Sequence, residues 1–328
     1  MIAQRVQLVV LAVAAIVVVA YLYLRLGDKA IQALPQAWGR RLTPYLFTGP
    51  AIVVLGMALV IPAGMTIVLS FFSADSSHFV GLDNYVATLS DAVTRIALRN
   101  TVLWVLLLPM GAVLVGLTIA VLTDRLRYGA LIKAALFLPI AISAVAAGVI
   151  WTFMYDYQPA GAAQTGTLNA LITTIPGVAP HAWIVDETTN NYALIASTLW
   201  TQAGFAMVIF AAALRSIPDE LYEAARLDGA SEWNVFRHIT LPLLGPTVLV
   251  VATTMTIVAL KAFDMVYVMT NGQYGTDVLS TVMYRFLFTA KDNGTAGAVA
   301  TILMIAVIPV MIFNLRQYRC DSVESRDA

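Results

Sequence analysis

Residues 215–242 have the sequence RSIPDELYEAARLDGASEWNVFRHITLP, a charged segment between two strongly apolar runs. Ionisable side chains are costly in the interior of a bilayer. The segment therefore predicts a loop outside the membrane with structure of its own. From its residues alone, this loop is either a well-capped connection without a partner or a docking element.

Local signals within this segment predict two short helices. Pro218 suits the first position of a helix, where its missing N–H costs nothing. Gly229 suits the left-handed residue that ends this helix, and Ser231 can cap a second one. Pro242 is expected to close the second helix. The prediction is a pair of helices joined at a glycine.

The rest of the chain is far more apolar than a soluble domain. Of 328 residues, 60% are hydrophobic and 12% are charged, and the mean hydropathy is +0.81. Soluble domains are about half apolar and about one quarter charged. The 19 Lys and Arg residues balance the 19 Asp and Glu residues, so we expect no nucleic-acid partner. A single cysteine, Cys320, excludes an internal disulfide and a cysteine-based zinc cluster. Composition predicts a membrane protein, and helical spans would make it an all-α one.

Seven apolar runs are long enough to cross about 30 Å of hydrocarbon as helices. The first is either a retained helix or a cleaved signal peptide, which would leave six spans. No small-x-small cleavage site follows it, which favours retention. The seven runs are Leu8–Leu24, Leu46–Phe72, Thr101–Thr123, Ala134–Tyr155, Tyr192–Leu214, Leu244–Met269 and Ala296–Leu315.

Basic residues fall mainly on one side of these spans. Because Lys and Arg near helix ends stay on the cytoplasmic side, their distribution predicts an amino terminus outside and a carboxyl terminus in the cytoplasm. Five basic residues then lie outside, and Lys261 lies within a span. The other thirteen lie inside: Arg25, Lys29, Arg40, Arg41, Arg125, Arg127, Lys133, Arg215, Arg226, Arg237, Arg316, Arg319 and Arg326.

The loop resembles the cytoplasmic EAA loop of the membrane subunits of bacterial binding-protein-dependent ABC importers. Glu223-Ala-Ala is followed by Gly229 six residues after the glutamate, and then by Leu241-Pro242. The resemblance covers most of the chain from about Leu46 onward. It includes the flanking motifs Gly81-Leu-Asp-Asn-Tyr85, Leu138-Pro-Ile-Ala-Ile-Ser143 with Trp151, and Ala212-Ala-Leu214.

The flanking motifs are similar to the sugar-importer branch, in particular to the larger permease of maltose-type and glycerol-phosphate-type systems. That branch usually has Thr-x-Gly-Gly-Pro after the sixth span. This chain has Thr270-Asn-Gly-Gln-Tyr-Gly275 instead, which resembles the α-glucoside members. The resemblance implies a type I importer transmembrane domain over residues 46–319, after an extra helix and linker over residues 1–45 and before a cytoplasmic tail over residues 320–328.

The resemblance also implies partners in the cytoplasmic membrane of a bacterium. These are a second permease, two ATPase subunits and an extracytoplasmic solute-binding protein. None of the four lysines ends a Gly-x-x-x-x-Gly-Lys-Ser/Thr loop. ATP and Mg²⁺ are therefore expected on the ATPase subunits, and neither an enzyme nor a cofactor is expected in this chain.

The resemblance implies that the loop docks in a groove of the ATPase. Glu223 would be an acidic partner for a basic residue, Ala224 and Ala225 would permit close approach, and Gly229 would let the chain reverse. The residues expected to couple the two subunits are Glu223, Ala224, Ala225, Asp228, Gly229, Leu241 and Pro242.

Sparse charge within the spans favours a neutral cargo. Lys261 and Asp264, three residues apart, are expected to share a helix face, where they either line the passage or pair with each other. Aromatic and amide groups suit a hydroxyl-rich solute, although aromatics also anchor helices at membrane surfaces. The expected path residues are Trp200, Gln202, Tyr155, Trp151 and Asp264. The alternative function is an ion-gradient-driven transporter or channel, which more often shows inverted repeats or ionisable pairs at the midplane.

Overall fold

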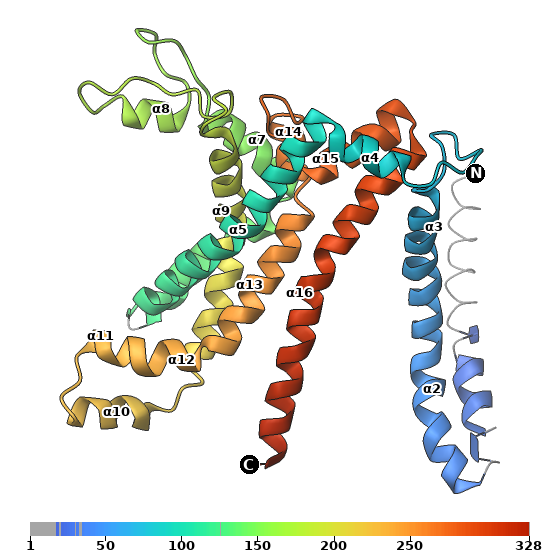
Figure 1. Ribbon diagram of the computed structural model, residues 1–328. Helices are drawn as coiled ribbons and strands as arrows, with labels where there is room; N and C mark the ends of the chain where they lie inside the picture. Colours follow the sequence, from blue (N-terminus) through green and yellow to red (C-terminus); the bar gives the residue numbers. More distant parts are fainter. Residues whose placement is uncertain (1–17, 20, 30, 33–34, 125, 328) are drawn as a thin grey trace, which may run out of the picture. The chain divides into compact units, whose positions relative to one another are not determined.

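The computed structural model describes residues 18–19, 21–29, 31–32, 35–124 and 126–327 (Figure 1). Most of the expected first span, Leu8–Leu24, lies outside these residues. The chain divides into two compact units, residues 1–66 and 67–328, and each is described by itself. Within the described residues the regular structure is helical, apart from one isolated bridge between Phe72 and Phe79. The all-α prediction is confirmed.

One long helix follows the amino-terminal residues. It consists of α2 (Gln36–Leu55), the π-helical turn η1 (Gly56–Val60) and α3 (Ile61–Leu69). Residues Trp38–Leu69 are long and apolar enough to cross a membrane, and none of their most apolar window is buried in this chain. A helix that is apolar on all sides requires lipid or another subunit as its surroundings.

Three helices pack together at the centre of the second unit: α5 (Ala92–Asp124), α9 (Asn190–Leu214) and α13 (Gly245–Leu260). Small residues allow close contact between α5 and α9. A Cβ added to Gly116 would lie 2.6 Å from the Cβ of Ala206. Ala112, Ala120, Phe210 and Val251 fill the buried interior of this group. The apolar stretches of α5 and α9 agree with two of the expected spans.

The expected span over Ala134–Tyr155 is not one continuous helix. The chain forms α6 (Gly129–Phe137) and the 3₁₀ turn η2 (Leu138–Ala141), then bends by 104° into α7 (Ala144–Met154). Pro139 lies in η2, and the Ser143 hydroxyl caps α7 by accepting a hydrogen bond from the Ala146 N–H at 3.2 Å. Proline and a new cap therefore interrupt the apolar run.

The expected span Leu244–Met269 is also interrupted. Helix α13 ends at Leu260, and the chain resumes as α14 (Asp264–Met269). Three described helices are long and apolar enough to span a membrane, or five if each bent pair counts as one span, compared with the seven expected. Within α16 (Asn293–Asp327), the apolar stretch Asn293–Pro309 is shorter than these spans.

The remaining elements are α4 (Asp83–Ser90), α8 (Thr167–Ile172), α15 (Leu279–Tyr284) and the π-helical turn η4 (Arg285–Ala290). Figure 1 shows that α8 and its loops lie at one end of the α5–α9–α13 group. The charged segment 215–242 lies at the opposite end. The α8 loops and the charged segment are thus at opposite ends of the apolar helices.

Candidate functional site

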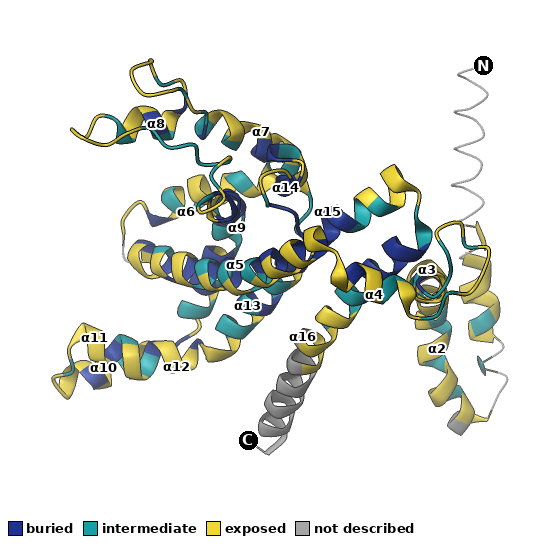
Figure 2. Ribbon diagram, turned by 45° about the horizontal axis from the view of Figure 1, so that its top comes forward, coloured by how far each residue is buried: buried dark blue, intermediate teal, exposed yellow. Residues whose placement is uncertain are grey.

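The charged segment forms the expected pair of helices. The first is α10 (Asp219–Leu227), and the second is built from α11 (Glu232–Val235), η3 (Phe236–Thr240) and α12 (Leu241–Leu243). Residues 215–242 are called the coupling loop below, after the role that the sequence resemblance implies for them. Figure 2 shows that its surface is mostly exposed, with a few buried residues between its two helices.

Gly229 ends α10 as predicted. Its φ of +75° lies in the left-handed region, and nothing lies within 4 Å of a Cβ added there. The N–H of Gly229 donates to the carbonyl of Arg226 at 3.1 Å, and the N–H of Ala230 donates to that of Ala225 at 3.0 Å. This pair of bonds is a Schellman motif, in which glycine is favoured for its backbone and not for space.

The second helix also begins as predicted. The Ser231 hydroxyl accepts a hydrogen bond from the Asn234 N–H at 3.3 Å. The helix ends at Leu243, one residue beyond Pro242, and the chain then bends by 65° into α13. Local capping by Gly229 and Ser231 therefore determines the turn between the two helices of the coupling loop.

Helix α10 has one face toward the protein and one toward solvent. Ala225 is buried, and Tyr222 is half-buried with its hydroxyl 3.4 Å from the Thr240 hydroxyl. Glu223 is exposed, and so is Leu227 four residues later on the same face. Glu223 is therefore available to a partner, whereas the Ala225 side chain packs within the chain itself.

The structure adds two strongly exposed apolar side chains to the coupling loop. Leu227 is 89% exposed and Trp233 is 66% exposed. These two side chains, together with the exposed Glu223, are accessible to a partner subunit. The four-residue spacing of Glu223 and Leu227 could have indicated this surface, but Trp233 carried no comparable periodic signal. Of the other predicted coupling residues, Ala224, Asp228, Gly229, Leu241 and Pro242 are all exposed.

Three predicted path residues come together as an aromatic group. Trp151 on α7 lies 5.1 Å from the ring of Tyr155 and 5.8 Å from that of Trp200 on α9. The buried Tyr155 donates its hydroxyl hydrogen to the Ala193 carbonyl at 3.0 Å. The group continues to Trp183, 6.2 Å from Tyr155. Trp183 lies in the loop between α8 and α9, and its distance along the sequence from Tyr155 gave no local signal of this contact.

Gln202 and Asp264 lie apart from this group. Trp200 and Gln202 are two residues apart on one helix, so their side chains point to roughly opposite faces. Trp200, together with Pro139 and Gly204, lines a cavity of about 560 Å³, which does not include Gln202. Gly204 allows α9 to approach α6, since an added Cβ would lie 2.5 Å from the Leu136 carbonyl oxygen. Asp264 is exposed at the start of α14.

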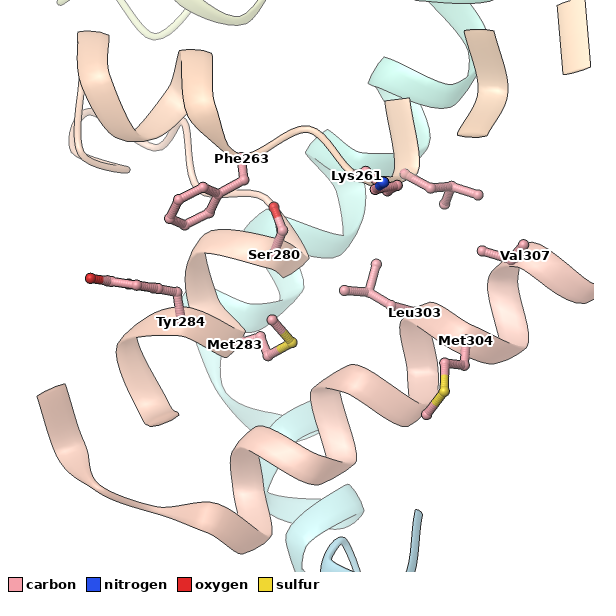
Figure 3. A pocket seen from close by; sticks show the side chains of 9 residues that line it. Lys261, Phe263, Ser280, Met283, Tyr284, Leu303, Met304 and Val307 are labelled. Atoms are coloured by element: carbon pink, nitrogen blue, oxygen red, sulfur yellow. The ribbon is translucent and has the colours of Figure 1, made fainter. Parts of the chain in front are cut away.

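The expectation that Lys261 and Asp264 share a helix face is wrong. Lys261 caps the end of α13, and Asp264 begins α14 after the break between them. No ion pair joins these two described residues. Figure 3 shows Lys261 with Phe263, Ser280 and Tyr284 around a mainly apolar cavity of about 390 Å³. The Ser280 hydroxyl donates to the Ala262 carbonyl and so stabilises the break.

The loop that contains α8 is organised around one buried side chain. The Asn169 amide donates to the carbonyls of Asp156 and His181 at 2.8 and 3.0 Å. Its oxygen accepts from the His181 N–H and the Trp183 indole N–H at 2.9 and 3.2 Å. The Asp186 carboxylate in this loop accepts hydrogen bonds from Thr188, and these lower its pKa. The bond from the Thr188 backbone N–H contributes most, followed by the bond from the Thr188 hydroxyl. The loop is therefore ordered and carries ionised carboxylate at neutral pH.

A second ordered loop follows α14. Residues Asn271, Gly272, Tyr274 and Gly275 all have positive φ. The Asn100 amide on α5 donates to the carbonyls of Gly275 and Asp277 at 2.7 and 2.8 Å. This is the segment in which the sequence departs from Thr-x-Gly-Gly-Pro, and no local pattern indicated its attachment to α5.

The chain is similar to known proteins over most of its length. Residues 2–318 match the family model described as "Binding-protein-dependent transport system inner membrane component". The chain is 46% identical over 274 residues to the osmoprotective compounds uptake permease protein GgtC of Synechocystis sp., covering 84% of this chain and 98% of that protein. It is 44% identical over 274 residues to the alpha-glucoside transport system permease protein AglF of Rhizobium meliloti, covering 83% of this chain and 81% of that protein.

A solved structure has the same fold. It is the crystal structure of a bacterial ABC transporter involved in the import of the acidic polysaccharide alginate. One of its chains matches with a TM-score of 0.72 and 23% identity, over 85% of this chain and 96% of that chain. The likeness confirms the expected type I importer fold.

Proposed function

We propose that this chain, which belongs to the family of inner membrane components of binding-protein-dependent transport systems, carries a neutral glycoside or a di- or oligosaccharide across the cytoplasmic membrane. Family membership supports an ABC importer subunit and not the alternative of an ion-gradient-driven transporter. The observation that carries the proposal is the coupling loop, an ordered helix pair with an acidic and apolar outer face at one end of the apolar helices.

The cargo class is supported by relatives and by side chains. One close relative is named for α-glucoside transport, and another, 29% identical, is the lactose transport system permease protein LacF of Rhizobium radiobacter. Aromatic faces such as those of Trp151 and Trp200 can pack against the C–H faces of sugar rings. We therefore place the passage beside this aromatic group.

The proposed assembly contains a second permease, two ATPase subunits that bind ATP and Mg²⁺, and an external solute-binding protein. The coupling loop lies in the cytoplasm in this proposal, and the loop with α8 lies outside. Glu223 and Leu227 would contact the ATPase, because both are exposed on one face of α10. Rigid-body movement of that helix pair would then move α9 and α13, which flank it in the chain.

One experiment tests both motor and cargo. The tagged chain is purified with the subunits that accompany it and reconstituted into vesicles with the solute-binding protein and radiolabelled maltose, trehalose or sucrose. We expect ATP-dependent accumulation of at least one sugar, and its loss when the Walker lysine of the copurified ATPase is replaced. Accumulation that persists with the inactive ATPase, or that requires only an ion gradient, would contradict the proposal.

A further inference from the structure

The ends of α5 and α9 meet the middle of α6 at one carboxylate beside the coupling loop. Asp124 is the last residue of α5, Lys133 lies on α6, and Arg215 directly follows α9. One oxygen of Asp124, Oδ1, lies 3.5 Å from the Lys133 ammonium and 3.6 Å from the Arg215 Nε. The same carboxylate oxygen thus faces two cations from different helices.

The buried ammonium of Lys133 requires the negative charge of Asp124. Its side chain is only 13% exposed, and its Nζ is buried without a hydrogen-bond partner in the described structure. An ammonium group removed from water is strongly unfavourable unless an opposite charge lies close to it. Among the described residues, Asp124 is the acidic side chain recorded within 4 Å of it.

The electrostatics of the helix ends explain the arrangement. A carboxylate at the carboxyl end of α5 is unfavourable with respect to the helix dipole, and two cations offset that cost. Arg215 is favourable at the carboxyl end of α9 for the same reason. The turn between α5 and α6 is tight, since a Cβ added to Gly129 would lie 2.3 Å from the Thr123 carbonyl oxygen.

Arg215 is also the first residue of the coupling loop. Farther along, Tyr222 and Phe236 of that loop pack against the buried group that contains Ala120 and Phe210. The segment 215–218 between these two attachments is a short turn ahead of α10, in which Arg215, Ser216 and Pro218 are exposed and Ile217 packs into the same buried group. The contact at Arg215 is the polar attachment that adds to this apolar one, and without it the turn is free to pivot about Ile217 when the loop moves.

We propose that Asp124 is a positioning residue that fixes the start of the coupling loop to the α5–α6 turn. Displacement of α10 and α11 then moves α5 and α6 with them, because the chain does not bend at residues 215–218. The inference rests on the proposed function in assigning the displacement to a partner ATPase. The attachment itself is a property of this chain and is measurable without transport.

The experiment measures the distance between the loop and α6. In a Cys320→Ser background, spin labels are placed at Leu221→Cys on α10 and Leu131→Cys on α6, two positions that are 42% and 71% exposed and lie outside the proposed ATPase contact. The full-length chain, with its copurifying subunits, is examined in lipid nanodiscs by double electron–electron resonance. The first test variant is Arg215→Gln, which removes the guanidinium that contacts Asp124. The second is Asp124→Asn combined with Lys133→Met, which removes the carboxylate without leaving a buried ammonium unpaired.

We expect a narrow distance distribution in the parent and one at least twofold broader in both test variants. Asp124→Glu should restore the narrow distribution, and Lys133→Met alone, which keeps the Asp124–Arg215 contact, should remain narrow. A merely structural role predicts a lower Tm for Asp124→Asn, recovery of Tm in the double variant, and no broadening in either test variant. Distributions as narrow as the parent in Arg215→Gln and in the double variant would overturn the proposal.

The two proposals can fail separately. If the ATPase-dependent accumulation of sugar is absent but the test variants broaden the distribution, the attachment stands and only the assigned motor is wrong. If sugar accumulation is normal and the distributions are unchanged, the assigned function stands and the role of Asp124 is wrong.

Discussion

The indole rings of Trp151 and Trp200 meet edge to face, with their centroids 5.8 Å apart and their planes at 76°. They come from α7 and α9, two helices separated by the whole loop that contains α8. Trp200 also lines the 560 Å³ cavity. This contact fixes the orientation of Trp200, because edge-to-face pairs are favourable by about 0.5–1.5 kcal/mol beyond the area they bury.

Trp200 and Gln202 should not contribute equally to transport. Their side chains point to roughly opposite faces of α9, so only one of them faces the passage. We expect Trp200→Ala to raise the KM for uptake roughly 10-fold, the equivalent of about 1.4 kcal/mol, and Gln202→Ala to change it little. Initial rates of uptake measure this, with Trp38→Ala, 60% exposed on α2, as the matched control. Equal losses in the Trp200 and Gln202 variants would contradict the geometry.

Removing the Asn100 amide should destabilise the loop after α14. Asn100→Ala leaves the Gly275 and Asp277 carbonyls without the donor that now bonds to both. Loss of a buried hydrogen-bond partner costs about 1–3 kcal/mol, so we expect a lower Tm and faster proteolysis at residues 270–277. Asn234→Ala, at an exposed position, is the control and should change unfolding by less than about 0.5 kcal/mol. Equal stability of the two variants would refute the role of Asn100.

The sequence predicted the helical class well but not the course of two helices. Averaged hydropathy reports how apolar a run is, and both halves of a bent span are apolar. The signals for the breaks were local: Pro139 before Ser143 in one run, and Lys261 within another. Assigning a shared face to Lys261 and Asp264 assumed an unbroken helix, and this assumption failed.

The two parts of the candidate site differed in how predictable they were. The coupling loop depends on Pro218, Gly229 and Ser231, whose effects extend only a few residues, so its helices could be predicted. The aromatic group and the Asn169 interactions join residues that are far apart in the sequence or lie in loops. No periodicity connects such residues, and only the fold brings them together.

The turn at residues 73–77 should stay ordered until strongly acidic pH. Donation from the side chains of Ser73 and Ser77, and from the Ser77 N–H, lowers the pKa of Asp75 from 3.8 to about 2. A carboxyl whose folded pKa is depressed stabilises the fold above its ordinary pKa and loses that effect as pH falls through the folded value. We therefore expect no change between pH 8 and pH 4, and loosening between about pH 3.8 and 2.

Pepsin cleavage near Phe72 and Phe79 measures this transition, because the protease acts in that pH range. Asp75→Ala supplies the reference, since its turn lacks the titrating group at every pH. The ratio of parent to variant cleavage should rise toward one as the pH approaches 2. A ratio that is already one at pH 4 would show that Asp75 does not order the turn.

Substitutions at Gly229 should separate backbone geometry from contact with the ATPase. Nothing lies near an added Cβ, so Gly229→Ala costs only its left-handed backbone, about 1–2 kcal/mol. Gly229→Asn should cost less, because asparagine visits this conformation more readily. Gly229→Pro cannot adopt it at all. We expect the amount of sugar transported per ATP hydrolysed to fall in the order Gly, Asn, Ala, Pro, with the protein still present in the membrane.

Glu223→Arg should also lower the amount of sugar transported per ATP hydrolysed, because it reverses an exposed charge while α10 stays folded. Glu223→Gln should give a value between those of the parent and Glu223→Arg. If all of these variants keep the parent ratio, the coupling loop does not transmit the ATPase cycle.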